Sequence, residues 1–185
     1  MAAKGHLFII SGPSGAGKST ILGTILGKRP QLRYSISYTT RLPRGNEQDG
    51  VDYHFISEVA FRKKIEAGEL AEWAEVHGRL YGTSATYLEE ALAVGQDVLL
   101  DIDVQGAERL FSKYPEAISV FVAAPDRAEL RKRLMKRGTD SPEAVERRLK
   151  DAEEEMTQAH LYDHVLVNDD LNQTVSRLEA ILEKA

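Results

Sequence analysis

A glycine-rich octapeptide near the amino terminus constrains this chain more than any other stretch of its sequence. Residues 12 to 19 read GPSGAGKS and satisfy the phosphate-loop pattern G-x-x-x-x-G-K-[ST]. The apolar run of residues 7 to 10 precedes the octapeptide, and apolar residues at helical spacing follow it from about Lys18. This motif requires a strand before it and a helix after it. The sequence therefore predicts a functional phosphate loop.

The residue types in this loop suit a polyphosphate. Glycines let backbone N–H groups point at an anion, and the N-terminus of the following helix adds a partial positive charge. The Lys18 ammonium is expected to reach the β- and γ-phosphates of a nucleotide, and the Ser19 hydroxyl is expected to bind a magnesium ion. The predicted phosphate-binding residues are Gly12, Pro13, Ser14, Gly15, Ala16, Gly17, Lys18, Ser19 and Thr20.

Apolar runs and amphipathic stretches alternate along most of the chain. Strands are predicted at residues 7–10, 97–102, 118–123 and 165–167, and helices from residue 18 and at 104–113, 126–136 and 171–183. This alternation predicts an α/β fold, a three-layer sandwich whose parallel central sheet is covered by helices on both faces. A length of 185 residues fits one domain.

Two segments interrupt the alternation. Residues 33–85 are richer in Tyr, Thr, Arg and Gly, and they are predicted to form an inserted mixed α/β subdomain around a helix near residues 58–67. The sequence RGTDSP at 137–142 separates two strongly charged helical stretches, and we expect a mobile helical lid over about 137–159. The expected core comprises about residues 1–32, 86–136 and 160–185.

Composition narrows the possible partners. The formal net charge of −5 argues against a general nucleic-acid binder, which needs a surplus of cations on one face. The chain has no cysteine, which excludes disulfides and thiolate metal sites and fits a reducing cytoplasm. The amino-terminal apolar run is too short for a signal peptide or a membrane span, so no membrane association is expected.

Acidic residues end one of the predicted strands. The run VLL at 98–100 leads into Asp101 and Asp103, whose carboxylates can reach a metal ion, its waters or a substrate near the loop. Asp103 is also suited to cap the helix predicted from Val104. Both interpretations remain open at this stage.

A phosphate loop alone fits ATPases, GTPases and small-molecule kinases, but the inserted segment is more specific. SYTTRLPR at 37–44 resembles the S-x-T-T-R-x-P-R signature of guanylate kinases, and GVDY at 50–53 resembles the G-x-x-Y that follows it in that family. Further matches occur in the family's order and span nearly the whole chain: AEWA at 71–74, YGT at 81–83, LDIDVQG at 100–106, RG at 137–138 and VNDD at 167–170.

This resemblance implies a P-loop kinase fold with an inserted GMP-binding subdomain and a lid. It also implies transfer of a phosphoryl group from ATP to GMP with Mg²⁺, with dGMP as an alternative acceptor. The resemblance assigns the following residues to GMP binding: Ser37, Arg41, Arg44, Tyr53, Glu72, Tyr81, Thr83, Asp101 and Asp103. It assigns Ser19 and Asp101 to the metal ion.

The implied roles agree with the chemistry of the side chains. Glu72 would accept the ring N–H and amino group of guanine, a donor pair that adenine lacks, with hydroxyl groups of Ser37 and Thr83 beside it. A clamp of two guanidinium groups and two phenols would grip the GMP phosphate: Arg41, Arg44, Tyr53 and Tyr81.

The resemblance also assigns residues to the ATP side. Arg137 and Arg148 are expected to cover the ATP phosphates on closure, and Asn168 to lie near the adenine. With Lys18 and Arg41, these two arginines make up the predicted catalytic set. An Asn after a strand is also an ordinary turn residue, and most charges on such helices face solvent.

Two other functions share much of this pattern. The first is a non-catalytic guanylate-kinase-like module that binds a phosphorylated protein, and the presence of Lys18 and Ser19 argues against it. The second is a kinase for another nucleoside monophosphate. The sequence does not fix the oligomeric state or the preference between GMP and dGMP.

Overall fold

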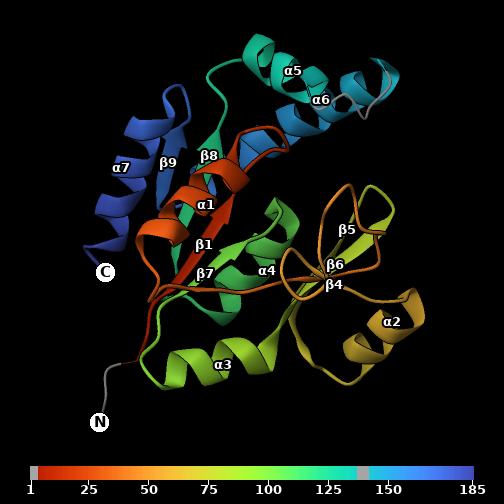
Figure 1. Cartoon of the computed structure of the whole chain (residues 1–185), viewed down its shortest axis with the longest axis vertical. Helices are drawn as coiled ribbons and strands as arrows, with labels where there is room; N and C mark the ends of the chain where they lie inside the picture. The colour runs from red at the N-terminus through yellow and green to blue at the C-terminus, as the bar shows by residue number, and fades with distance from the viewer. Residues whose placement is uncertain (1–3, 137–141) are drawn as a thin grey trace. The chain divides into compact units, whose positions relative to one another are not determined.

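The computed structural model describes residues 4–136 and 142–185, and helices alternate with strands along most of this length (Figure 1). The chain divides into two compact units. We call Met1–Leu7 with Gln31–Ala117 the hairpin unit, and Phe8–Pro30 with Ile118–Ala185 the phosphate-loop unit. The predicted α/β class is confirmed. The boundaries predicted for the core, the subdomain and the lid stay predictions.

Parallel strands form the centre of the phosphate-loop unit. These strands are β1 (Leu7–Ser11), β8 (Ile118–Ala123) and β9 (His164–Val167). Phe8 of β1 pairs with Ile118, and Val120 of β8 pairs with His164. All five residues of β1 are buried, as expected for a strand of a parallel sheet with both faces covered.

The helices of this unit are α1 (Lys18–Lys28), α5 (Arg127–Lys136), α6 (Pro142–Met156) and α7 (Leu171–Leu182), with a short 3₁₀ helix, η1, at Thr157–Leu161. Two ion pairs join the end of α1 to the end of α7: Lys28 to Glu179 at 3.0 Å and Arg29 to Glu183 at 2.5 Å. These ion pairs hold α1, the helix that follows the loop, against α7.

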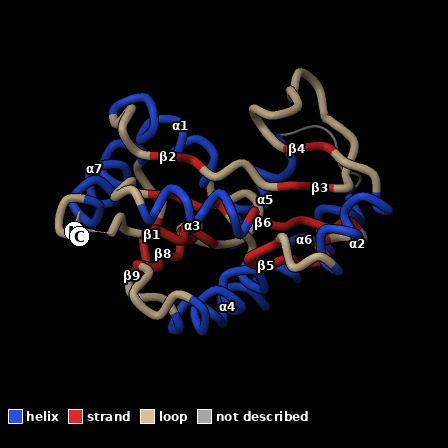
Figure 2. Tube along the Cα trace, turned by 90° about the horizontal axis from the view of Figure 1, so that it is seen from below, coloured by secondary structure: helices blue, strands red, loops and turns tan. Residues whose placement is uncertain are grey.

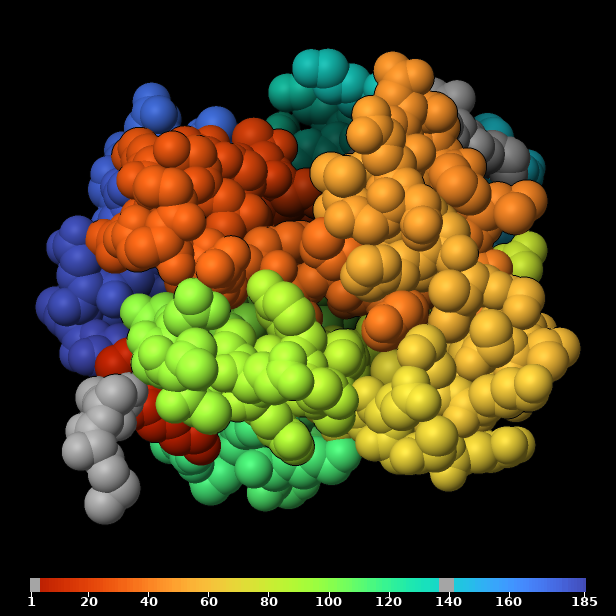
Figure 3. Space-filling model, turned by 60° about the horizontal axis from the view of Figure 1, so that its bottom comes forward, coloured from red at the N-terminus to blue at the C-terminus, as the bar shows by residue number. Residues whose placement is uncertain are grey.

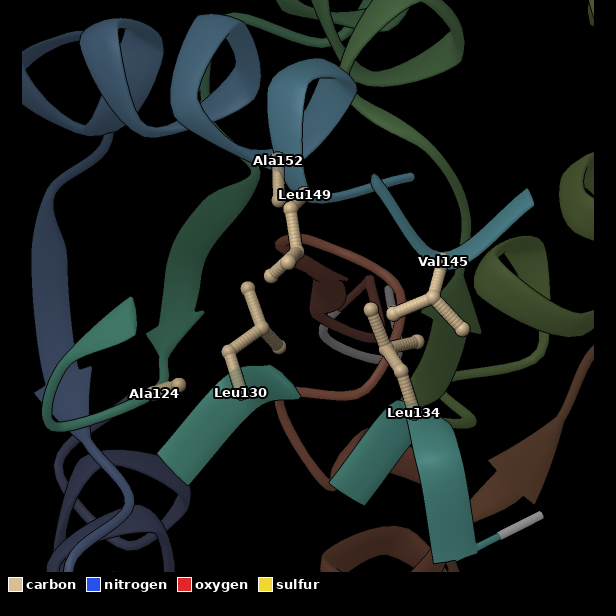
Figure 4. Close-up of a cluster of buried hydrophobic side chains, with 6 residues drawn as sticks. All are labelled: Ala124, Leu130, Leu134, Val145, Leu149 and Ala152. Atoms are coloured by element: carbon tan, nitrogen blue, oxygen red, sulfur yellow. The ribbon is translucent and has the colours of Figure 1, made fainter. Parts of the chain in front are cut away.

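Helices α5 and α6 share an apolar core of their own. Figure 4 shows Leu130 of α5 directed toward Leu149 of α6 and Leu134 of α5 directed toward Val145 of α6, with Ala124 and Ala152 in the same cluster. Leu134 and Leu149 are fully buried. These buried leucines tie α6 to α5. The mobile lid predicted over about 137–159 stays a prediction. Residues 137–141 lie outside the described residues.

The hairpin unit contains two groups of strands. In the first, β2 (Arg33–Tyr34) runs parallel to β7 (Val98–Asp101). The second is a mixed sheet of β4 (His54–Phe55), β3 (Tyr38–Thr39), β6 (Arg79–Ser84) and β5 (Leu70–Val76), in that order. Figure 2 shows these strands in red near α2 (Glu58–Glu66).

A tight hairpin joins β5 to β6. Val76 pairs with Arg79, so His77 and Gly78 alone make the turn, with φ of 50° and 72°. Two positive φ angles define a type I′ turn, whose twist matches that of the strands. The hairpin packs on Phe61 of α2, which is fully buried.

Two more helices complete the hairpin unit, α3 (Ala85–Ala93) and α4 (Val104–Lys113). Ser84 caps α3, and its side chain accepts a hydrogen bond from the backbone N–H of Tyr87 at 3.3 Å. In Figure 3 the residues of α3, coloured lime green, lie at the surface. None of the helices in residues 4–136 and 142–185 is both long and apolar enough to cross a membrane.

Candidate active site

The phosphate loop has positive φ angles, which glycine adopts most readily, at Gly12, Gly15 and Gly17. Gly12 and Gly17 have φ of 134° and 100°, in the left-handed region. A Cβ atom on Gly12 would lie 2.1 Å from the carbonyl oxygen of Val122, and one on Gly17 would lie 2.3 Å from Nδ2 of Asn168. The loop therefore needs glycine both for its backbone angles and for its close contacts.

Helix α1 begins at the end of this loop without a side-chain cap. Gly17 occupies the N-cap position, and no described side chain hydrogen-bonds there. By contrast, α2, α3, α4 and α7 each begin with a Ser or Asp that accepts a backbone N–H. The first N–H groups of an uncapped helix can donate to an anion.

Lys18 folds back over the loop. Its Nζ atom donates to the carbonyl oxygen of Gly12 at 2.6 Å, which places the ammonium group above the glycines. Ser19 and Thr20 follow in the first turn of α1, where both are exposed. The Ser19 hydroxyl is thus accessible to a ligand at the start of the helix.

The loop rests on a brace of two side chains. Nδ2 of Asn168 donates to the carbonyl oxygen of Ala16 at 2.8 Å, and Nη1 of Arg133 donates to the same oxygen at 3.1 Å. Arg133 also donates through Nη2 to the carbonyl oxygen of Asn168 at 2.9 Å. Asn168 is buried. The structure therefore places Asn168 against the loop, and its predicted position near the adenine stays a prediction.

Arg133 was missed by sequence reasoning, which expected most charges of these helical stretches to face solvent. Its position four residues after Glu129 was the available signal, because that spacing orients an arginine on a helix. Nε of Arg133 donates to Oε1 of Glu129 at 3.0 Å. This bond directs the guanidinium group toward the loop.

Of the two lid arginines predicted to act on ATP, only one can be placed. Arg148 of α6 is half-buried and donates a hydrogen bond from Nη2 to the hydroxyl of Ser14, inside the loop. A cation on α6 is therefore brought to the phosphate loop. Arg137 lies outside the described residues.

In the hairpin unit, Glu72 of β5 and Thr83 of β6 form a buried pair. Thr83 donates from Oγ1 to Oε1 of Glu72 at 2.6 Å. Glu72 is only 5% exposed, which excludes a solvated surface charge. The pKa of Glu72 is raised to about 7, chiefly by burial. The hydrogen bond from the Thr83 hydroxyl opposes this shift, and the negative charge of Asp103 adds to it.

Space around this carboxylate is restricted by α4. A Cβ atom on Gly106 would lie 2.6 Å from Oε2 of Glu72, so the close approach of α4 requires glycine. Lys113 of α4 donates to the carbonyl oxygen of Ala71, and the guanidinium of Arg109 lies 4.8 Å from the ring centre of Trp73. These contacts fix the strand that carries Glu72. Ser37, also predicted to hold the base, is buried.

Three of the four predicted phosphate-clamp residues meet in the same unit. Nε of Arg41 donates to the hydroxyl of Tyr81 at 3.2 Å, and its Cζ lies 5.0 Å from the ring centre of Tyr53. The rings of Tyr53 and Tyr81 stand edge to face at 5.9 Å. Arg44 is the fourth clamp residue, and it is exposed.

An acidic residue that sequence reasoning left uninterpreted also contacts Arg41. Glu47 accepts from Nη1 and Nη2 of Arg41 at 2.7 and 3.0 Å. This hydrogen-bonded carboxylate is the main cause that raises the pKa of Arg41. Only the position of Glu47 in the turn, three residues before Gly50 and three after Arg44, could have suggested the contact.

The two aspartates after β7 have different surroundings. Asp103 caps α4, because its Oδ1 accepts from the backbone N–H groups of Gln105 and Gly106 at 2.8 and 3.2 Å. Of the two interpretations left open for Asp103, the structure shows the helix cap. Asp101 is half-buried, and its charge adds to burial in raising the pKa of Tyr34 and that of Tyr53, the latter to about 12.

The α/β fold and the glycine loop before an uncapped helix are those of a P-loop nucleotide-binding protein and are consistent with the P-loop kinase fold. The family model described as guanylate kinase matches residues 4–185. The chain belongs to the guanylate kinase family, and its enzyme class is nucleoside monophosphate kinase. The family predicted from the motifs is thereby confirmed.

Individual relatives agree with the family model. The chain is 51% identical over 184 residues to a guanylate kinase of Symbiobacterium thermophilum, covering 98% of this chain and 87% of the relative. It is 47% identical to that of Dechloromonas aromatica, covering 96% and 88%. The crystal structure of guanylate kinase from Anaplasma phagocytophilum matches with a TM-score of 0.83 at 32% identity, covering 100% of this chain and 87% of that one.

A more distant likeness bears on the fold alone. A shikimate kinase from Bacteroides thetaiotaomicron matches with a TM-score of 0.55 at 15% identity, covering 96% of this chain and 98% of that one. The fold is therefore shared beyond the family.

Proposed function

We propose that this chain transfers the γ-phosphoryl group of ATP to the phosphate of GMP, giving ADP and GDP. One observation carries this proposal. Two neighbouring strands of one sheet hold a buried carboxylate and a tyrosine that is hydrogen-bonded to a buried guanidinium group. Glu72 lies on β5, and Tyr81, which accepts from Arg41, lies on β6. The carboxylate suits the donor edge of guanine, and the guanidinium suits a phosphate.

Selection of the base follows from the burial of Glu72. Its Oε2 and the remaining lone pair of Oε1 can accept the ring N–H and the amino group of guanine. Adenine offers a ring acceptor in place of that N–H, so the buried carboxylate would face it unpaired. A site of this kind discriminates by about 10⁴-fold or more against a substrate that lacks the bonding group. Thr83 and Ser37 are the proposed hydroxyl partners.

Placement of the acceptor phosphate is assigned to the clamp. Arg41 and the hydroxyls of Tyr53 and Tyr81 donate to the phosphate oxygens, and Arg44 extends to them from the rim. A guanidinium fork fixes direction as well as charge. The GMP phosphate is already largely ionised near neutral pH, so no side chain is needed to remove a proton from it.

ATP is assigned to the phosphate loop. The first N–H groups of α1 and the ammonium of Lys18 neutralise its β- and γ-phosphates, and Arg148 joins them from α6. Arg137 is kept as a second cation on this side, and Asn168 is proposed to support the loop while lying near the adenine. In the transfer, the bond from the γ-phosphorus to the β,γ-bridging oxygen breaks, and a bond to an oxygen of GMP forms in line with it.

We propose that Ser19 and Asp101 supply the protein ligands of a magnesium ion. The exposed hydroxyl of Ser19 and the carboxylate of Asp101 are hard oxygen donors of the kind that Mg²⁺ prefers, and this ion is usually bound by few protein ligands plus substrate phosphates. Among the described residues, no group of three His, Asp or Glu forms a ready cage for a metal. When bound, the ion would neutralise charge on the transferred phosphoryl group.

Transfer between two phosphates asks little covalent chemistry of the protein. Positioning and charge neutralisation supply most of the barrier lowering, and effective concentrations from positioning reach about 10⁵ M or more in favourable cases. We propose that closure of the lid excludes water, so that GMP rather than water accepts the phosphoryl group. The proposed location is the cytoplasm.

The test is a reaction with purified protein, ATP, MgCl₂ and GMP, with ADP and GDP separated by chromatography. We expect equal amounts of both products, no GDP without metal, and slower or absent reaction with AMP, UMP and CMP. dGMP is included in the series as an acceptor. Binding of GMP without any GDP would identify a non-catalytic binding module, and preference for another monophosphate would reassign the acceptor.

A further inference from the structure

The carboxylate of Glu47 occupies one edge of the Arg41 guanidinium group. Its two oxygens accept from the two terminal nitrogens, Oε2 from Nη1 at 2.7 Å and Oε1 from Nη2 at 3.0 Å. This is an end-on, bidentate pair, the geometry in which a guanidinium is held most rigidly. The side chains of Arg41 and Glu47 are 9% and 25% exposed, so the pair is largely shielded from water.

The other N–H groups of Arg41 show which edge is left. A guanidinium group carries five N–H donors. Nη1 gives its second one to the carbonyl oxygen of Leu42 at 2.8 Å, and Nε gives its one to the hydroxyl of Tyr81 at 3.2 Å. The remaining donor is the Nη2 N–H on the side of Nε. It therefore lies on the edge of the guanidinium that also contacts Tyr81.

The position of Glu47 is itself fixed by the chain. Its Oε2 also accepts from the backbone N–H of Arg44 at 2.7 Å, and its own N–H donates to the carbonyl oxygen of Arg44 at 3.0 Å. The turn from residue 44 to 47 is thus closed by two hydrogen bonds. The Arg41 guanidinium and the Arg44 N–H hold the pKa of Glu47 below its ordinary value, so the group stays ionised near neutral pH.

We propose that Glu47 is a positioning residue for the acceptor phosphate. It holds the end of the Arg41 fork and thereby presents the remaining Nη2 N–H, beside the Tyr81 hydroxyl, to the phosphate of GMP. Glu47 does not contact the phosphate. It acts through Arg41, and it fixes the backbone of Arg44, the second arginine of the clamp. This inference rests on the proposed function and names a determinant of its acceptor site.

The opposite role would be that of a competitor. The Glu47 carboxylate neutralises the positive charge of Arg41. If the GMP phosphate had to bind the same Nη1–Nη2 edge, removal of that carboxylate would strengthen GMP binding. The end-on geometry favours positioning, because the Nε–Nη2 edge and the Tyr81 hydroxyl stand outside the Glu47 contact. The two roles make opposite predictions for the affinity of GMP.

Glu47→Gln is the variant that separates them. Glutamine keeps the size of the side chain but offers one acceptor oxygen, and its amide group cannot accept from the second terminal nitrogen. We expect the KM for GMP to rise about tenfold, as the loss of a charge-assisted bidentate contact leaves the fork free to turn, while the KM for ATP changes less than about twofold.

The control variant is Glu58→Gln. Glu58 also pairs with an arginine, Arg62, at 2.6 Å in the same unit, but both side chains are about 60% exposed. The variant makes the same change of charge at a surface pair, so it reports any long-range electrostatic effect. We expect both KM values of this variant to equal those of the wild type within about twofold.

Calorimetry with GMP and with guanosine provides a second readout. Guanosine lacks the phosphate, so Glu47→Gln should weaken binding of GMP and leave that of guanosine unchanged. Glu47→Asp, which keeps the carboxylate, should recover part of the affinity and serves as the folded variant if Glu47→Gln does not fold. A lowered KM for GMP would show a competitor and overturn the proposal, as would equal losses for GMP, guanosine and ATP. A wild-type protein that makes no GDP would instead refute the proposed function itself.

Discussion

At the scale of single residues, the ammonium group of Lys18 is held over the phosphate loop. It donates to the backbone carbonyl oxygen of Gly12, at 2.6 Å within the same loop. A cation at the start of a helix whose first N–H groups have no side-chain cap is suited to bind an anion in that place. The position of the charge follows directly from the loop geometry.

We expect Lys18→Met to lower kcat by about three orders of magnitude or more, because it removes a cation that stabilises charge on the transferred phosphoryl group. Lys28→Met on the same helix is the matched control, since Lys28 pairs with Glu179 far along α1. Steady-state rates of ADP formation measure both. A Lys18→Met enzyme with a near-normal kcat would remove Lys18 from the mechanism.

The raised pKa of Glu72 predicts that the free energy of unfolding depends on pH. Burial raises its pKa from 4.5 to about 7, so the folded protein holds this proton more tightly than the unfolded chain does. As pH rises from 4.5 to 7 the unfolded state ionises first, and the free energy of unfolding therefore falls by about 3 kcal/mol on account of this group.

Urea unfolding of wild type and Glu72→Gln at several pH values measures this effect. The stability difference between the two proteins should shift in favour of the variant as pH rises through that window. Glu75→Gln on the same strand, at an exposed position, should follow the wild type throughout. A constant difference between wild type and Glu72→Gln would show that Glu72 titrates normally.

Some side-chain contacts of the site could not be predicted from the sequence. The motif at 37–44 predicted Arg41 as a phosphate ligand, but nothing in the string indicated that Glu47 would hold its other edge. That contact depends on how the turn after Pro43 closes, which is a property of the folded backbone. Arg133 and Asn168 likewise meet only because α5 and the end of β9 both reach the loop.

At the scale of elements, periodicity predicted most of the structure. The predicted strand at 118–123 and the helix at 104–113 coincide with β8 and α4, because their apolar spacing and the Asp103 cap are local signals. The hairpin of β5 and β6 was not predicted as such. Its strands mix buried glycine, threonine and glutamate, so the alternation of apolar residues is weak there, and the His77–Gly78 turn is not a usual I′ pair.

The brace between β9 and the loop gives an element-scale prediction. Asn168→Ala removes one of two donors to the Ala16 carbonyl, so we expect the KM for ATP to rise about tenfold and the free energy of unfolding to fall by about 1 to 2 kcal/mol. The KM for GMP should change little. Asn172→Ala, at an exposed position on α7, is the control. Equal effects on ATP and GMP would show that the brace supports the protein generally rather than the loop.

At the scale of the whole molecule, the two substrates are assigned to different parts of the chain. The base-reading carboxylate and the arginine clamp lie in the hairpin unit, and the uncapped helix with its glycine loop lies in the phosphate-loop unit. Motifs predicted this division because each half carries its own signal. They could not predict how far the lid closes, since that depends on ligands and on contacts between distant segments.

The central claim is that one part of the chain selects guanine while the other binds ATP. The most direct test is to measure kcat/KM for GMP and for AMP, with ATP and MgCl₂, and to take their ratio. We expect a ratio of about 10³ or more in the wild type and a loss of most of that preference in Glu72→Gln. A wild-type ratio near unity, or a preference that survives the loss of the carboxylate, would contradict the account.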